Sequence, residues 1–246
     1  MNKMKNPLLN AIFIGLTAYL SHYGVDFAMD PPGAGGADAP PPRGIFGKGM
    51  QDALGRTISE GGKPAIVIVD TDNWAVDIAA PGKITGMERV IKYAAKNNLP
   101  ILDIQIGDGG NDDVLWRTLG VLMKAARASD GYVAYLKDGV YPASPTRVFK
   151  DAAPGESGIG GWKSVDFRAE LEAMDVDTFF VMGYADSCCV LETTKTLLDY
   201  GYAVQVERPG LNISRPYARV YQSNQEYQRL KEKCPDKFTE IKSEGC

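Results

Sequence analysis

The strongest constraint on the fold is a set of short apolar runs separated by segments of helical pattern. Residues 65–70 read Ala-Ile-Val-Ile-Val-Asp, and 101–106 and 178–182 have a similar length. A continuous apolar run of this kind is typical of a strand that is covered on both faces. Alternating strands and helices build a parallel sheet with right-handed crossovers. The sequence therefore predicts a three-layer α/β fold with a mostly parallel central sheet.

The remaining elements follow from periodicity and from helix start and stop signals. We expect further strands at 203–206 and 238–241, the latter at an edge, a strand ending at 148–150, and at 132–136 either a short strand or a hairpin arm. Helices are expected at 87–98, 114–128, 166–174, 189–200 and 222–233, and loops at 107–113 and 154–161.

The first 62 residues differ in character from the rest. Lys3 and Lys5 precede the apolar run Leu8–Leu20, which matches the plan of an export signal and is short for a membrane span. Residues 1–30 are therefore expected to be a signal peptide or N-terminal anchor, and 31–62 a linker rich in Pro and Gly with a lead-in to the domain. Residues 63–246 form the predicted domain. This organisation favours a periplasmic or secreted protein; the alternative is a cytoplasmic one whose first helix packs on the domain.

Composition and motifs argue against several classes of function. The 246 residues carry a formal net charge of -4, which offers no electrostatic footprint for nucleic acid. No strand is followed by a G-x-G-x-x-G or a Walker lysine, so nucleotide binding has no support. The chain has one histidine, His22, so Cys-His dyads, Ser-His-Asp triads and histidine zinc sites are excluded from the domain.

Cysteine chemistry is the leading hypothesis. Val181–Val190 runs from an apolar strand into a turn and places Cys188 and Cys189 where a helix begins. Unpaired N–H groups and the partial positive charge of a first helical turn favour a thiolate and can bind an oxyanion. Without a nearby histidine, the base must be a carboxylate or a lysine. Cys234 and Cys246 are either a disulfide or two free thiols.

Three reactive residues are expected at one edge of the sheet. Asp70, Lys150 and the Cys188-Cys189 turn each follow a predicted strand, and ligand sites of open α/β sheets assemble at the carboxyl ends of strands. Lys163 is a rival to Lys150. The ordinary alternatives are a capping aspartate, a solvated lysine and a cysteine that fills the core.

These features resemble the isochorismatase-like cysteine hydrolases, the family of nicotinamidases, N-carbamoylsarcosine amidases and isochorismatases, over roughly Pro64 to the C-terminus. The matching segments are Ile-Val-Asp70, Val-Phe-Lys150, the glycine-to-cysteine turn from Gly183, and Thr85-Gly86-Met87-Glu88. Aligned on Gly183, the nucleophile falls at Cys189. The resemblance implies a Rossmann-like α-β-α fold, a catalytic triad of Asp70, Lys150 and Cys189, an oxyanion hole from the backbone N–H groups of Ala185 and Cys189, and a homo-oligomer.

Two departures bear on specificity. Family members with a metal use Asp and His ligands after the second strand, and 101–113 contains no histidine, so we expect no metal and no other cofactor. The segment Thr71–Trp74 also differs from the family pattern. Trp74, Trp162 and Tyr184 either line a pocket for a small-molecule substrate or belong to the core. Asp108, Asp112 and Asp113 are either oxygen ligands for a hard cation or a solvated turn.

The functional expectation is a metal-independent cysteine hydrolase that cleaves a C–N bond of a small amide or ureide through a thioester. One alternative is a vinyl-ether hydrolase of the isochorismatase type, in which Asp70 is a general acid and the cysteine is dispensable. Another is a catalytically inactive binding protein of the same fold, tethered at the envelope. Membrane contact is expected from the N-terminal segment alone, and no nucleic acid partner is expected.

Overall fold

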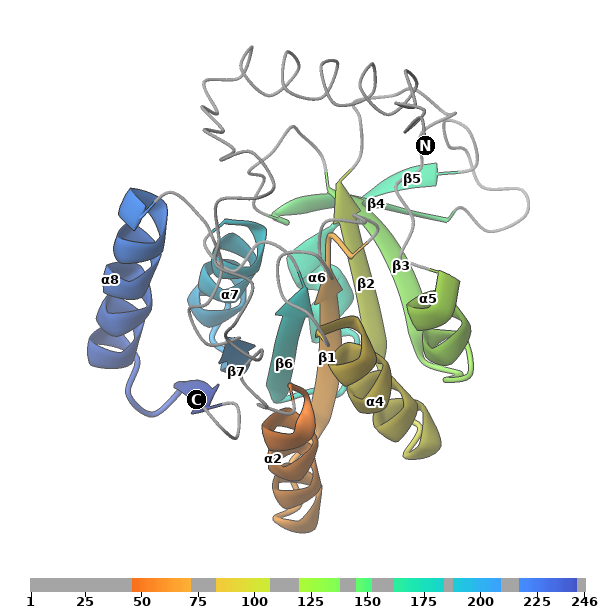
Figure 1. Ribbon diagram of the computed structural model, residues 1–246. Coiled ribbons are helices and arrows are strands. Elements are labelled where there is room, and N and C mark those ends of the chain that lie inside the picture. The colour runs from red at the N-terminus through yellow and green to blue at the C-terminus, as the bar shows by residue number, and fades with distance from the viewer. Residues whose placement is uncertain are drawn as a thin grey trace, which may run out of the picture. The chain divides into compact units, whose positions relative to one another are not determined.

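A mixed sheet of eight strands runs through the centre of the computed structural model, in the order β5-β4-β3-β2-β1-β6-β7-β8 (Figure 1). The structure describes residues 46–71, 83–106, 120–137, 145–151, 162–183, 188–208 and 217–242. The strands are β1 Pro64–Val69, β2 Ile101–Ile106, β3 Tyr132–Lys137, β4 Arg147–Asp151, β5 Trp162–Asp166, β6 Thr178–Gly183, β7 Ala203–Arg208 and β8 Phe238–Lys242.

Helices cover both faces of the sheet, which confirms the predicted three-layer α/β fold (Figure 1). They are α2 Lys48–Ser59, α4 Lys83–Lys96, α5 Gly120–Ala126, α6 Phe167–Glu172, α7 Cys189–Asp199 and α8 Tyr217–Lys233. Buried side chains of α2, α4 and α5 share one core cluster with Ile66 and Ile68 of β1. Those of α6, α7 and α8 share the other with Val67 and Val69. Successive residues of β1 therefore face opposite layers, as a strand requires.

The strands β1 and β6 form the middle of the sheet. Every residue of both is buried, and they pair in parallel from Pro64 with Thr178 to Val69 with Gly183. Burial on both faces is the reason that their sequences read as continuous apolar runs. Parallel pairing also brings the two carboxyl ends to the same edge, as predicted.

The other half of the sheet differs from the prediction. β3 is a full strand parallel to β2 that continues one residue beyond the expected end, to Lys137. β4 is antiparallel to β3, and β5, which the sequence did not predict, is antiparallel to β4. The carboxyl end of β4 therefore points away from the edge where β1 and β6 end. Half-buried positions in β5 gave no continuous apolar run that could have revealed it.

Helix α2 lies within the range predicted to be linker and lead-in, so the packed domain begins earlier than residue 63. Met50, Ala53 and Leu54 are buried against the sheet. The N-cap residue Gly47 provides no side-chain cap. Instead, the buried carboxylate of Glu207 in β7 accepts hydrogen bonds from the backbone N–H of Gly47 at 3.0 and 3.1 Å and of Met50 at 3.2 Å. An anion at the positive end of a helix stabilises it.

The start of α2 crosses the first turn of α4 at two glycines. A Cβ at Gly47 would overlap the carbonyl of Gly86, and a Cβ at Gly86 would overlap that of Phe46. The glycine of the Thr85–Glu88 segment thus has a packing reason. Arg89 supports the crossing by donating to the carbonyl of Phe46 at 3.3 Å.

The predictions for the N-terminal segment and for Cys246 concern residues that the structure does not describe. The N-terminal segment 1–30 and the linker up to residue 45 lie outside the described residues, as does Cys246. Cys234 is a free thiol. Among the helices that the structure describes, none is long and apolar enough to cross a membrane.

We predict that Glu207→Gln lowers the free energy of unfolding by about 1–2 kcal/mol, because a neutral amide weakens charge-assisted bonds at a buried helix start. Urea denaturation measures the change. The control is Glu172→Gln, since Glu172 forms an exposed pair with Arg168 one turn away. That control should unfold like the wild type. Equal stability of Glu207→Gln and the control would contradict the capping role.

Candidate active site

The ends of β1 and β6 approach each other more closely than side chains would allow. Gly183, the last residue of β6, has a positive φ of 143°. A Cβ at this position would overlap the carbonyl oxygen of Val69, its register partner in β1. Glycine is therefore required where the chain leaves β6 for the turn before α7. This close approach places the start of α7 beside the residue that follows β1.

That residue is Asp70, and its backbone is left-handed, with φ 48°. In an extended strand Asp70 would face the same layer as Ile68, on the side of α2, α4 and α5. The left-handed turn interrupts the alternation, while the Asp70 N–H still donates to the carbonyl of Ile104 in β2 at 3.0 Å. Its carboxylate thereby reaches residues of the α7 layer. Non-glycine residues in this conformation are strained and cluster at functional sites.

The carboxylate of Asp70 contacts an ammonium and a thiol. Lys137 Nζ donates to Asp70 Oδ2 at 2.6 Å, and the Cys189 thiol is within hydrogen-bonding reach of the same carboxylate. All three residues are buried, with 5% exposure for Asp70, 1% for Lys137 and none for Cys189. The structure thus brings together a carboxylate from the end of β1, an ammonium from β3 and a thiol from α7.

The lysine at this site is Lys137, which corrects the prediction of Lys150. Lys137 ends a strand parallel to β1 and so lies at the shared carboxyl edge. Lys150 lies in antiparallel β4, level with Tyr135, roughly 7 Å further from that edge at about 3.4 Å per residue. Its ammonium binds both carboxylate oxygens of Glu170 in α6, at 2.6 and 2.7 Å.

The missed signal was the length of β3. The sequence prediction ended that strand at Leu136 and left its order in the sheet open, so the following lysine was not recognised as a strand-end residue. The rival Lys163 pairs with Lys150 in the ladder of β4 and β5, away from Asp70.

The ion pair is costly to bury and strongly held once formed. Moving a carboxylate and an ammonium out of water carries a penalty of several kcal/mol each, which close contact must offset. At 2.6 Å the contact has the length of a charge-assisted hydrogen bond. Removing one partner would leave an uncompensated charge in the interior. Asp70 and Lys137 therefore act as a unit.

Cys189 does not carry the ready thiolate that its helix-start position predicted. Burial is the largest cause that raises the pKa of the Cys189 thiol, and the negative charge of Asp70 raises it further. The ammonium of Lys137 lowers this pKa by a smaller amount. Desolvation and a nearby carboxylate thus outweigh the helix terminus. These causes favour the neutral thiol over the thiolate beside the ion pair.

Other predicted site residues lie elsewhere or outside the described residues. Trp162 is the first residue of β5, which is four strands away from β1 in the sheet. At about 4.8 Å per strand, the two strands are roughly 19 Å apart. Trp162 is therefore not part of the cluster of Asp70 and Cys189.

The remaining predicted site residues lie outside the described residues: Trp74, Tyr184, Ala185 and the loop with Asp108, Asp112 and Asp113. Within the described ranges, no group of three or more His, Cys, Asp or Glu side chains is arranged to hold a metal ion.

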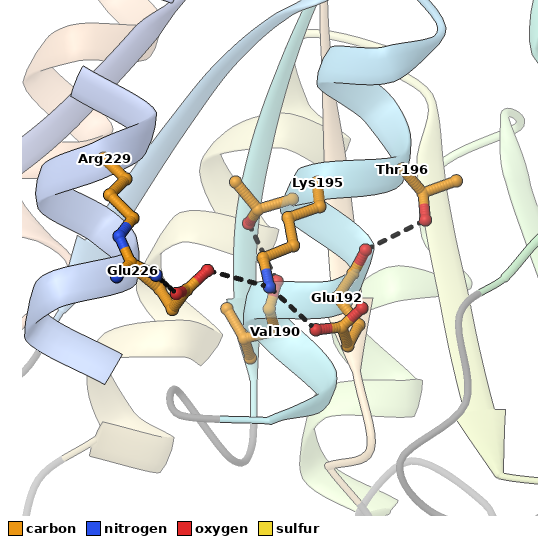
Figure 2. A network of polar contacts seen from close by, with 7 residues as sticks. Val190, Glu192, Lys195, Thr196, Glu226 and Arg229 are labelled. Carbon is orange, nitrogen blue, oxygen red and sulfur yellow. Dashed lines mark hydrogen bonds and ion pairs between the residues drawn. The ribbon is translucent and has the colours of Figure 1, made fainter. Parts of the chain in front are cut away.

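An ion pair links helix α7 to the neighbouring helix α8 (Figure 2). Lys195 donates to Glu192 on its own helix at 3.1 Å and pairs with Glu226 of α8 at 3.3 Å, and Arg229 also binds Glu226. The bond from Lys195 lowers the pKa of Glu226. The pair of Glu192 and Lys195 on α7 therefore extends to a second helix. This partly exposed network orients α7 more than it stabilises the fold.

Comparison with known proteins gives similarities of structure. No family model matches the sequence, and no curated protein matches it. A nicotinamidase from Staphylococcus aureus has a TM-score of 0.48 at 16% identity, with 72% of this chain and 99% of that chain covered. An isochorismatase from Pseudomonas putida has 0.46 at 15%, covering 73% and 88%. The MAR1 ribonuclease from Caenorhabditis elegans has 0.46 at 16%, covering 68% and 73%. The similarity is one of fold.

Isochorismatase-family structures, the family that the sequence resembles, are thus among the structural neighbours. A shared fold can carry unrelated chemistry. The chemistry of this chain therefore depends on the residues that meet at its own site.

We predict that Cys189 reacts with iodoacetamide more slowly than the half-buried Cys188 and Cys234 at pH 7.5. Because its pKa is raised, the thiolate fraction is still increasing at high pH, so its alkylation rate should climb through pH 9 without a plateau. Peptide mass spectrometry over a pH series measures each site, and Cys189→Ala confirms the assignment. A plateau below pH 8 would show a preformed thiolate instead.

Proposed function

We propose that this protein is a hydrolase of the isochorismatase-like type that uses Cys189 as nucleophile on a small amide or ureide. The observation that carries the proposal is the buried carboxylate of Asp70 in contact with both the Lys137 ammonium and the Cys189 thiol. A nucleophile, a base and a group that orients the base are the recurring parts of covalent hydrolysis.

Each residue has a distinct role. Since the thiol is neutral at rest, Asp70 accepts its proton as the sulfur attacks the carbonyl carbon. Lys137 holds the Asp70 carboxylate in place and offsets the negative charge that develops on sulfur and oxygen. Cys189 lies at the first position of α7, where backbone N–H groups have no partner within the helix. Those of Cys189 and Ala185 are the proposed oxyanion donors.

The bond changes balance over two half-reactions. Sulfur forms a bond to the carbonyl carbon, the C–N bond breaks, and Asp70 returns the proton to the departing nitrogen, which leaves as ammonia or an amine. A water molecule then attacks the thioester while Asp70 takes one of its protons. The C–S bond breaks, and that proton returns to sulfur. The products are a carboxylic acid and an amine, with the thiol restored.

The proposal uses no metal ligand. The segment 101–113 contains no histidine, and the chain's one histidine, His22, lies in the N-terminal segment. The electrophile is therefore polarised by backbone donors in this mechanism. Oxyanion donors in other hydrolases contribute about 3–4 kcal/mol each to lowering the barrier.

The alternatives use the same fold differently. A vinyl-ether hydrolase requires a protonated Asp70, whereas an ammonium at 2.6 Å stabilises the negative charge of the carboxylate. The contact therefore supports a base over an acid. A binding protein without turnover would have no chemical need for a strained aspartate and a buried lysine at the nucleophile.

The test is a screen of small primary amides, nicotinamide included, and N-carbamoyl amino acids for ammonia release by the full chain. Turnover by the wild type, a thioester adduct seen by mass spectrometry, and loss of both in Cys189→Ala would support the proposal. Cys188→Ala is the matched control and should retain turnover. Continued turnover by Cys189→Ala would overturn the nucleophile, and a wild type inert toward the whole panel would favour the binding protein.

The two lysines give a second prediction. Lys137→Met should reduce kcat at least 100-fold, because the carboxylate loses the group that holds it. Lys150→Met is the control and should change kcat by less than about twofold, since Lys150 binds Glu170 instead. Ammonia release under saturating amide measures both. The reverse ranking would restore Lys150 as the active-site lysine.

Lys137→Met also leaves Asp70 as an unpaired buried charge, at a cost of about 3–5 kcal/mol in stability. The double variant Asp70→Asn with Lys137→Met removes both charges, and should regain part of this loss while remaining inactive. Urea denaturation and ammonia release together separate the loss of chemistry from the loss of folding.

A further inference from the structure

A second set of buried polar side chains lies on the face of the sheet opposite the Lys137 ammonium. Tyr132 of β3 donates its hydroxyl to Asp103 of β2 at 2.8 Å. The Gln105 side-chain amide donates to Asp103 and, at 3.5 Å, to the hydroxyl of Thr71. This chain of contacts runs from Tyr132 of β3 through Asp103 and Gln105 of β2 to Thr71, the residue after Asp70 and two residues beyond the end of β1.

Three members of the set are buried as deeply as the hydrophobic core, and Tyr132 is partly buried. Exposure is 1% for Asp103, 3% for Gln105 and zero for Thr71. Burial and the Asp103 carboxylate raise the pKa of the Tyr132 phenol, and Arg127 lowers it by a smaller amount. The phenol therefore remains a donor. Buried polar groups are costly unless they are hydrogen-bonded, so these side-chain contacts hold the neighbouring segments together.

Rigidity matters here because of the backbone of Asp70. Its left-handed φ directs the carboxylate away from the α4 face, where strand alternation would place it, and toward Lys137 and Cys189. A strained residue keeps such a conformation only where its surroundings fix the chain on both sides. The Asp70 N–H is fixed by Ile104. The following residue, Thr71, is held by the hydrogen bond from Gln105.

We propose that the bond between Gln105 and Thr71 is a positioning device for Asp70, which sets the carboxylate at the distance and angle needed to take the Cys189 proton. Thr71 and Gln105 are positioning residues and touch no reacting atom. This inference rests on the proposed function of Asp70 as a base. It adds that residues on the opposite face of the sheet determine how well that base works.

The experiment separates positioning from stability with two substitutions at Thr71. Thr71→Val keeps the shape and loses the hydroxyl, whereas Thr71→Ser keeps the hydroxyl and loses a buried methyl group. Each should lower Tm by about 2–4 °C. Thr178→Val is the matched control, since Thr178 is a largely buried threonine at the opposite end of β6 whose hydroxyl binds Asp177.

The probe is p-nitrophenyl acetate, an activated ester. The Cys189 sulfur displaces p-nitrophenolate and forms an acetyl thioester while Asp70 takes the thiol proton. The first turnover is seen as a burst at 400 nm. Thr71→Val should slow the burst about tenfold or more, because small misplacements of a catalytic group are expensive. Thr71→Ser and Thr178→Val should stay within about twofold of the wild type.

A double-mutant cycle provides an independent check. Gln105→Met removes the amide at the other end of the same bond, and should slow the burst like Thr71→Val. Their combination should be no slower than the slower single variant, since one bond cannot be lost twice. A wild-type burst rate in Thr71→Val, equal slowing by Ser and Val, or fully additive effects would each overturn the positioning role.

The burst assay distinguishes a wrong assignment of the nucleophile from a wrong assignment of the positioning residues. If Cys189→Ala retains the burst, the proposed nucleophile is wrong. If Cys189→Ala loses it and Thr71→Val does not slow it, Cys189 stands and the positioning role alone is overturned.

Discussion

The buried ion pair between Asp70 and Lys137 is the contact on which the candidate site depends. It joins the ends of the first and third strands of the chain at the edge of the sheet and places a carboxylate beside the thiol of Cys189. Either charge would strongly destabilise the fold if it were buried without the other. The ion pair therefore requires that β1, β2 and β3 keep their order and register. A site built this way is rigid, as proton transfer requires.

Two residues with positive φ, Asp70 after β1 and Gly183 at the end of β6, determine the geometry of the candidate site. The positive φ of Gly183 lets β6 and β1 end in near contact, and the positive φ of Asp70 turns a carboxylate from one layer of the fold to the other. Both lie at the ends of β1 and β6, two strands in which every residue is buried. Packing there supplies the stability that strained residues consume.

Helices are held in place by carboxylates at distant points of the chain. Glu207 fixes the start of α2 from the sheet, and Glu226 ties α7 to α8 (Figure 2). The second of these contacts stabilises the orientation of the helix that begins with Cys189. Electrostatic contacts thus set the geometry of the layers, while the two apolar clusters supply most of the driving force.

The sequence by itself determined the layered α/β fold, the buried strands β1 and β6, and two of the three residues at the site. Runs such as 65–70 can be recognised because burial on both faces demands apolar side chains, and Asp70 and Cys189 stand next to elements with strong local signals. Strand direction has no such local signal. Only the tertiary structure decided that β3 runs parallel to β1 and β4 antiparallel, which places Lys137 rather than Lys150 beside Asp70. It also decided the protonation of Cys189, because the pKa of a thiol depends on the groups that surround it in space, and these come from strands far apart in the chain.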